Sequence, residues 1–269
     1  MPVMFLSDLE AASYGRYGGS VPQADLERFF YLDDAGQALV AGLRGDHNRL
    51  GFSVQLTTAR YIGRFLADPL AGVPAEVIDY LAGQLQVADP SCVKKYAQRQ
   101  QTHLDHAGKI RKVLKLKDFA QVEAELAVCV GRRAWVTGGS PKAIFADGVG
   151  WLRERDVLLP GVTTLARLVA RERDAATGRL WESLYAATAG QQRAALDALL
   201  VVPPGSRVPE LERWRTGPAR QSGPQMVRAL HRVAEITGSG LSRVELDASV
   251  TPRRRLSWPG TGWPRTWRS

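Results

Sequence analysis

Basic and amide side chains are concentrated between residues 90 and 117, and these residues are the best suited in the chain to bind a polyanion. This stretch, called the basic segment here, contains eight Lys or Arg residues and a single acidic residue, Asp105. Lys and Arg neutralise phosphates, whereas Gln, Arg and Thr can form hydrogen bonds with base edges in the major groove. The composition therefore predicts a nucleic-acid contact. The alternative is a solvent-exposed basic face on an ordinary helix.

The basic segment follows a turn, as the second helix of a helix-turn-helix does. The first helix is expected after Pro74, and Asp89 and Pro90 are suited to be the N-cap and the first residue of the second helix. A single continuous helix is expected from Pro90, with Leu104 facing inward and His106 facing outward. Its predicted contacts with bases and nearby phosphates are Ser91, Lys94, Lys95, Gln98, Arg99 and Thr102. Its predicted contacts with phosphate alone are Lys109, Arg111, Lys112 and Lys115.

A second basic surface is expected on a long helix over residues 49–66. At 100° per residue one side of this helix, called the arginine stripe here, spans an arc of about 80°, and apolar residues occupy most of the rest. The stripe consists of Arg49, Ser53, Thr57, Arg60 and Arg64. Gln55 is the exception among the apolar residues. We expect the arginines of the stripe, with Arg44 and His47 near the helix start, to contact DNA, although a central helix can also expose arginine without any ligand.

No arrangement of catalytic or metal-binding residues stands out. Asp46 and His47 are adjacent, so they do not face one another on a helix, and no Ser or Cys nucleophile is associated with them. His103 and His106 are three residues apart but have no evident third metal ligand, so we expect a solvent-exposed pair. No phosphate-binding glycine loop occurs. The sequence predicts neither catalysis nor a cofactor or metal.

Composition agrees with a nucleic-acid partner. The chain has 269 residues, 45% of them apolar, and a formal net charge of +9. Such a charge favours nucleic acid first and an acidic membrane surface second. The two cysteines, Cys92 and Cys129, do not form a CxxC motif, which indicates a reducing compartment. Neither a signal peptide nor a membrane-spanning run is apparent, so a cytoplasmic, nucleoid-associated protein without membrane contact is expected.

Apolar residues recur at helical spacing through most of the chain, which predicts an all-α protein. We expect tandem small helical domains of the helix-turn-helix type, followed by a helical linker. The expected parts are a first DNA-binding domain (1–69), a helix-turn-helix domain (70–117), a helical linker or interaction domain (118–202), a partial helical segment (203–240) and a basic tail (241–269). The tail lacks periodicity, so it is expected to be either disordered or the product of a shifted reading frame.

Several stretches resemble the N-terminal region of Tn-three family transposases, which are replicative bacterial transposases of the DDE type. They are YGRYGG (14–19), LERFFYLDD (26–34), RGDHNRLGFSVQLTTARYIGRFL (44–66), PSCVKKYAQR (90–99) and LLPGVTTLARLVARER (158–173). The resemblance extends from about residue 5 to residue 200 and departs after about Gly240.

The resemblance implies helix-turn-helix domains that bind double-stranded DNA at the terminal inverted repeats of a transposon. In this family the metal-dependent, three-carboxylate catalytic domain lies far downstream, so the resemblance implies a truncated, non-catalytic fragment. It also implies a possible homodimer or a complex with the full-length transposase. One alternative is a helical interaction or regulatory module that associates with a complete transposase, and another is an active nuclease.

Overall fold

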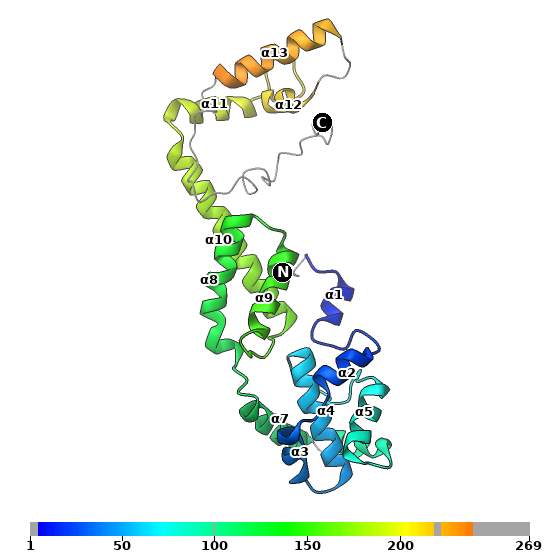
Figure 1. The fold of residues 1–269 in the computed structure, drawn as a ribbon. Helices are drawn as coiled ribbons and strands as arrows, with labels where there is room; N and C mark the ends of the chain where they lie inside the picture. The colour runs from blue at the N-terminus through cyan, green and yellow to red at the C-terminus, as the bar shows by residue number, and fades with distance from the viewer. Residues whose placement is uncertain (1–4, 99, 218–221, 239–269) are drawn as a thin grey trace. The chain divides into compact units, whose positions relative to one another are not determined.

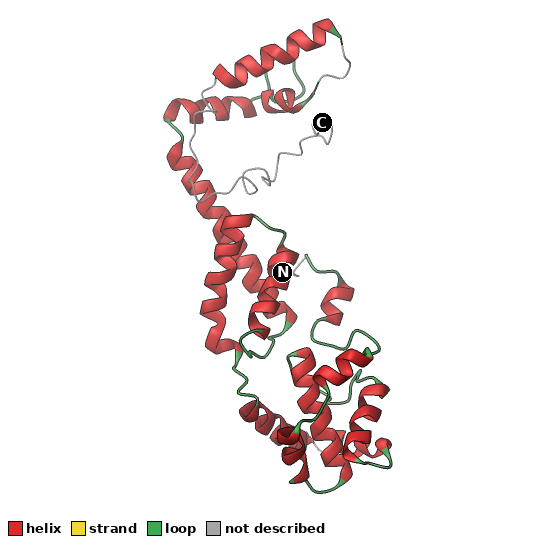
Figure 2. Ribbon diagram, in the orientation of Figure 1, coloured by secondary structure: helices red, strands yellow, loops and turns green. Residues whose placement is uncertain are grey.

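The computed structural model describes residues 5–98, 100–217 and 222–238, and these residues are helical with connecting loops (Figure 2). Within these ranges β-bridge pairing is limited to an isolated bridge between Lys117 and Val157. The predicted all-α class is therefore confirmed. The basic tail predicted over residues 241–269 lies outside the described residues.

The chain divides into two compact units. Unit 1 comprises residues 1–134 and 139–173, and unit 2 comprises residues 135–138 and 174–269. Unit 1 contains α1 (Asp8–Ser13), α2 (Gln23–Phe29), α3 (Asp34–Ala41), α4 (Asp46–Ile62), α5 (Ala75–Leu85), the 3-10 helix η1 (Pro90–Val93), α6 (Lys94–Ala97), α7 (Gln100–Val113) and α9 (Pro141–Arg153) (Figure 1). Helices α8 (Phe119–Thr137) and α10 (Val162–Ala187) contribute residues to both units. Unit 2 also contains α11 (Gly190–Leu200), α12 (Glu210–Arg215) and α13 (Gly223–Gly238), of which the last two lie in the predicted partial helical segment.

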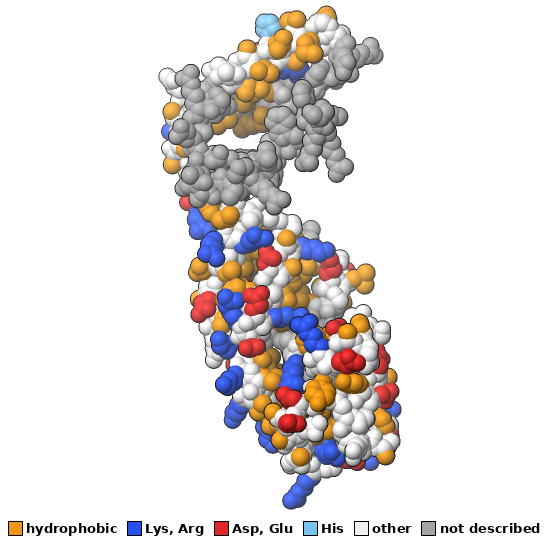
Figure 3. Space-filling view, viewed as in Figure 1, with side chains coloured by type: hydrophobic (Ala, Val, Ile, Leu, Met, Phe, Trp, Pro, Cys, Tyr) orange, Lys and Arg blue, Asp and Glu red, His pale blue; other side chains and the backbone are white. Residues whose placement is uncertain are grey.

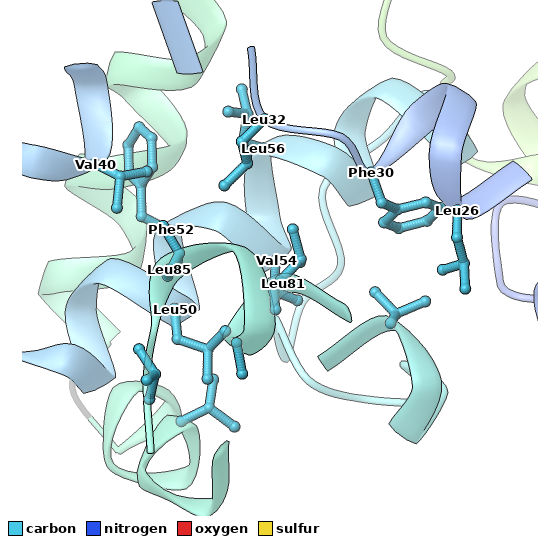
Figure 4. Packing of buried hydrophobic residues seen from close by; sticks show 14 of the residues in the cluster. Leu26, Phe30, Leu32, Val40, Leu50, Phe52, Val54, Leu56, Leu81 and Leu85 are labelled. Carbon is cyan, nitrogen blue, oxygen red and sulfur yellow. The ribbon is translucent and has the colours of Figure 1, made fainter. Parts of the chain in front are cut away.

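Helix α4 is the centre of unit 1. It begins after Gly45 (φ +82°) and ends at Gly63 (φ +84°), two backbone conformations that glycine adopts without strain. Every residue from Leu50 to Ala59 is buried, because α2, α3, α5, η1, α6 and α7 all contact this helix. Apolar side chains from α4 and α5 meet in the core (Figure 4). Each large apolar side chain buried in this way contributes roughly 1.5–3 kcal/mol.

One core joins the first two predicted domains. Leu26 and Phe30, from the first predicted domain, belong to the same buried cluster as Val77, Val93 and Ile110 from the second. The boundary predicted after residue 69 therefore falls within a continuous core. Folding of the basic segment depends on α4, because Val93 and Ile110 have their apolar partners there.

A buried polar network fixes the basic segment on α4. The Tyr96 hydroxyl, on a side chain with 0% exposure, donates a hydrogen bond to Gln55 Oε1 at 3.0 Å and lies 3.0 Å from His106 Nδ1. A hydroxyl has one hydrogen, so His106 Nδ1 is the donor in the second bond. The Tyr96 ring lies directly on the backbone of α4 at Gly51, where an added Cβ would come within 2.2 Å of the ring. Only glycine allows this approach.

Replacing Gly51 with alanine tests the close approach of the Tyr96 ring. The Gly51→Ala Cβ would overlap a fully buried ring, so the free energy of unfolding should fall by about 2 kcal/mol or more. The matched control is Gly83→Ala on α5, because Gly83 is exposed and an added Cβ there has open space. That change should raise stability by up to about 1 kcal/mol. Chemical denaturation of both variants measures the difference, and equal stability would refute the packing described here.

Candidate nucleic-acid interface

Residues close together in the sequence form the turn that precedes the basic segment. Helix α5 ends at Gln86 in a left-handed conformation (φ 54°). The Asp89 carboxylate then accepts a hydrogen bond from the Ser91 backbone N–H at 3.0 Å, and Pro90 occupies the first turn. Hydrogen bonds from Ser91 lower the pKa of Asp89, so the carboxylate is held in its charged form. The N-cap and first-turn positions predicted for Asp89 and Pro90 are confirmed.

The helix that follows is not continuous as predicted. It consists of η1, then α6, then α7. Gln98, which follows α6, is in a turn. Arg99, a predicted base contact, lies outside the described residues.

The surface of the basic segment is rich in free cations. Seven of the predicted contacts are exposed to solvent, and they are Ser91, Lys94, Lys95, Gln98, Lys109, Lys112 and Lys115. Within the described ranges, none of these five lysines forms an ion pair with a carboxylate. Blue side chains line the edge of unit 1 where α7 leads into α8 (Figure 3). The lysine face, as we call the surface formed by Lys94, Lys95, Lys109, Lys112 and Lys115, can neutralise phosphates without first breaking internal salt bridges.

Two predicted contacts of the basic segment are less available. Arg111 is half-buried and forms an ion pair with Asp118. Thr102 is also half-buried. Arg111 therefore stabilises the end of α7 in the free protein, and a phosphate would have to compete with a carboxylate for its guanidinium.

The prediction that the arginine stripe faces solvent is wrong along the middle of α4. Ser53 and Thr57 have 0% exposure, and their hydroxyls donate to the carbonyl oxygens of Arg49 and Ser53 at 2.9 and 2.8 Å. The guanidinium of Arg49 donates to Asp46 at 3.1 Å and to the Leu85 carbonyl at 3.2 Å, so it joins the start of α4 to the end of α5. The stripe is covered because the following helices pack over it, which a helical wheel cannot show.

The other residues predicted for the first DNA-binding domain lie at the two ends of α4. Arg44 lies just before α4 and is exposed to solvent. His47 lies in the first turn of α4 and is half-buried. Arg60 and Arg64 are half-buried near the last turn. Arg60 lines an open cavity of about 830 Å³. Arg44 and His47 therefore lie at the opposite end of α4 from Arg60 and Arg64.

That cavity contains arginines that the sequence analysis missed. Arg16, Arg28 and Arg153 line it with Arg60. They come from a loop, from α2 and from the end of α9, so no spacing in the sequence associates them. The glycine-rich stretch Tyr14–Gly19 is the one local signal. Gly15 has a φ of +63°, and an added Cβ would lie 2.3 Å from the side chain of Arg64.

The two histidines of α7 are buried, so the predictions of an exposed pair and of an outward His106 are wrong. His103 is 8% and His106 5% exposed, whereas Leu104, expected to face inward, is 54% exposed. The buried side runs through Tyr96, His103 and Ile110 at intervals of seven residues, and Leu104 lies to one side of it. Burial lowers the pKa of His106 from its ordinary value, nearby Lys109 adds to the effect, and Asp105 opposes it. The buried imidazole is therefore kept neutral beside Tyr96.

Comparisons with known proteins agree with the sequence resemblance. A family described as a domain of unknown function (DUF4158) matches residues 5–171. The transposase for transposon gamma-delta of Escherichia coli strain K12 is 37% identical over 246 residues, which is 91% of this chain and 24% of that protein. The transposase for transposon Tn501 of Pseudomonas aeruginosa is 30% identical over 78% of this chain and 21% of its own length. The transposase for transposon Tn1546 of Enterococcus faecium is 26% identical over 86% and 23%.

The chain belongs to the DUF4158 family, and its relatives over most of its length are Tn-three family transposases, as the sequence predicted. It spans about a quarter of the length of these relatives. Among the described residues, no helix combines the length and apolarity required to cross a bilayer. Within the same residues, no group of three His, Cys, Asp or Glu side chains is placed to hold a metal ion.

The pH dependence of stability tests the buried position of His106. Because its pKa is lowered by folding, the stability it contributes is present above the unfolded pKa of about 6.5 and is lost as pH falls through that value toward the folded pKa. His106→Gln should flatten this decline between about pH 7 and pH 5. Urea denaturation at several pH values measures it, with His47→Gln as the control. A slope unchanged in His106→Gln would mean that the imidazole titrates as an exposed group.

Proposed function

We propose that this chain binds double-stranded DNA through the lysine face, as the DNA-binding part of a Tn-three family transposase acting at transposon terminal inverted repeats. The observation that carries the proposal is the set of exposed, unpaired lysines on a segment anchored in the core by Tyr96. The names of the relatives support it, since a transposase must engage transposon DNA.

Within this proposal the contacts divide by position. Lys109, Lys112 and Lys115, on α7 and at its end, would neutralise phosphates and set the position of the protein on the duplex. The exposed Ser91, Lys94, Lys95 and Gln98 lie on the short helix α6 or next to it, and they would contact base edges. Arg44 and His47 would add flanking backbone contacts.

The chemistry of DNA cleavage is proposed to reside outside this chain. The chain corresponds to less than a quarter of the length of the relatives, and we assign no catalytic residue among the described side chains. The described part of the chain would therefore bring the transposase to its substrate rather than cut it.

A second candidate function is contact with another protein through unit 2. Helix α13 exposes Met226, Leu230 and Val233 at helical spacing, each more than half exposed. Such a row of apolar side chains suits a helix-to-helix contact with a complete transposase or a second copy of the chain. Co-purification with a full-length transposase that persists after nuclease treatment would favour this function.

Neutralising two lysines tests the phosphate contacts. The double variant Lys109→Gln and Lys112→Gln should bind duplex DNA more weakly and lower the slope of log affinity against log salt by about 2, because two fewer counterions are released. The control is Arg132→Gln with Arg167→Gln, which removes the same charge from exposed positions on α8 and α10. Fluorescence anisotropy over a salt series measures both. Equal slopes for the two double variants would contradict the assignment.

Selection from a random duplex library tests sequence specificity. The intact chain should enrich one motif, and that motif can be compared with the terminal inverted repeats of the transposons that encode the relatives. Gln98→Ala should reduce discrimination between this motif and unrelated DNA by about tenfold, which corresponds to the loss of one base contact. Failure to enrich any motif would overturn sequence-specific binding while leaving general binding open to the salt test.

A further inference from the structure

The cavity of about 830 Å³ in unit 1 has walls that are fixed by specific contacts. The guanidinium of Arg153 donates to the carbonyl oxygens of Tyr61 and Ile62, both at 2.9 Å. Carbonyls in the last turn of a helix have no hydrogen-bond donor within the helix, so Arg153 caps the end of α4 with a positive charge. The Leu159 N–H donates to the Gly63 carbonyl at 2.9 Å, which holds the segment after α9 against the same helix end. Hydrogen bonds thus hold α9 and the segment after it against the end of α4 along one wall of the cavity.

The lining of the cavity is strongly cationic. Arg16, Arg28, Arg60 and Arg153 line it, whereas Asp156 is its one acidic residue. In the described part of the chain, none of these four guanidiniums forms an ion pair with a carboxylate. Cations gathered around one cavity without carboxylate partners repel each other, and an anionic ligand would relieve that repulsion.

Aromatic side chains line the same cavity. Phe29 and Tyr61 are half-buried there, with ring centroids 5.4 Å apart in an edge-to-face arrangement. The guanidinium carbon of Arg28 lies 5.0 Å from the centroid of the Phe29 ring. Nucleotide sites on single strands combine guanidinium groups for phosphate with flat groups on which a base can stack. In the view of Figure 3, Lys and Arg side chains lie near the centre of this face of unit 1.

We propose that this cavity binds one or a few unpaired nucleotides through their phosphates. Its volume falls in the range of small-molecule sites, roughly 300–1,000 Å³, and is too small to admit a double helix. Arg16, Arg28 and Arg60 would hold phosphate oxygens, and Phe29 and Tyr61 would contact the base. The ligand can come from an unpaired strand of bound DNA or from a free nucleotide, and both present this chemistry. The inference does not depend on duplex binding by the lysine face.

Titration calorimetry on the full chain tests the proposal with three probes, which are inorganic pyrophosphate, thymidine triphosphate and a 5′-phosphorylated thymidine trinucleotide. Arg16→Gln and Arg28→Gln should each weaken nucleotide binding about tenfold. Arg167→Gln, an exposed arginine outside the cavity, should leave it unchanged. A trinucleotide that binds more tightly than the triphosphate points to a DNA strand, and the reverse order points to a free nucleotide.

Two outcomes would overturn the proposal. One is no heat of binding for any probe at low salt, and the other is equal weakening by Arg16→Gln and Arg167→Gln, which would indicate general attraction to a basic protein. The fold of each variant is checked by its thermal melting curve. Because Arg16 and Arg28 are exposed, both variants are expected to fold. The affinity of the same variants for duplex DNA should be unchanged. Measuring that affinity therefore separates a failure of this inference from a failure of the proposed function.

Discussion

The contact on which the rest of unit 1 depends is the stacking of the Tyr96 ring on the backbone of α4 at Gly51, with the tyrosine hydroxyl bonded to Gln55 and adjacent to His106. It brings two helices closer than any side chain would allow and satisfies three buried polar groups at once. A buried polar network costs stability when any member is left unpaired, so it specifies one arrangement of the chain. That arrangement sets the position of α6 and α7 relative to α4.

The lysine face follows from this constraint. Val93, Tyr96 and Ile110 are buried in the core, and the lysines between and after them are exposed. Lysine has a long, flexible side chain, and phosphate contacts require only charge within reach. A packed helical core that carries flexible lysine side chains on its surface is suited to binding a regular polyanion such as DNA. The same core extends across the boundary between the first two predicted domains, so both predicted DNA-binding regions share one folding unit.

The all-α class and the turn at Asp89 and Pro90 could be predicted because their causes are local, namely apolar periodicity, an N-cap carboxylate and a proline in the first turn. The burial of the arginine stripe could not be predicted, because periodicity identifies the residues on one side of a helix but not the neighbouring helices that pack on that side. The positions of Leu104 and His106 were exchanged because the buried side of α7 carries two histidines, which apolar periodicity does not detect. Gln55, unusual among apolar neighbours, was the one sign of the buried network. The arginines of the cavity come from distant segments, so only the fold brings them together.

Lysine acetylation footprinting with mass spectrometry can show whether the lysine face contacts duplex DNA. The chain is treated with a limiting acetylating reagent with and without duplex DNA, and the modification of each lysine is compared. We expect duplex DNA to protect Lys94, Lys95, Lys109, Lys112 and Lys115 from acetylation. Lys142, which pairs with Glu10 away from the basic segment, should react equally in both conditions. Unchanged reactivity of the five lysines in the presence of bound DNA would mean that the lysine face is not the DNA-binding surface.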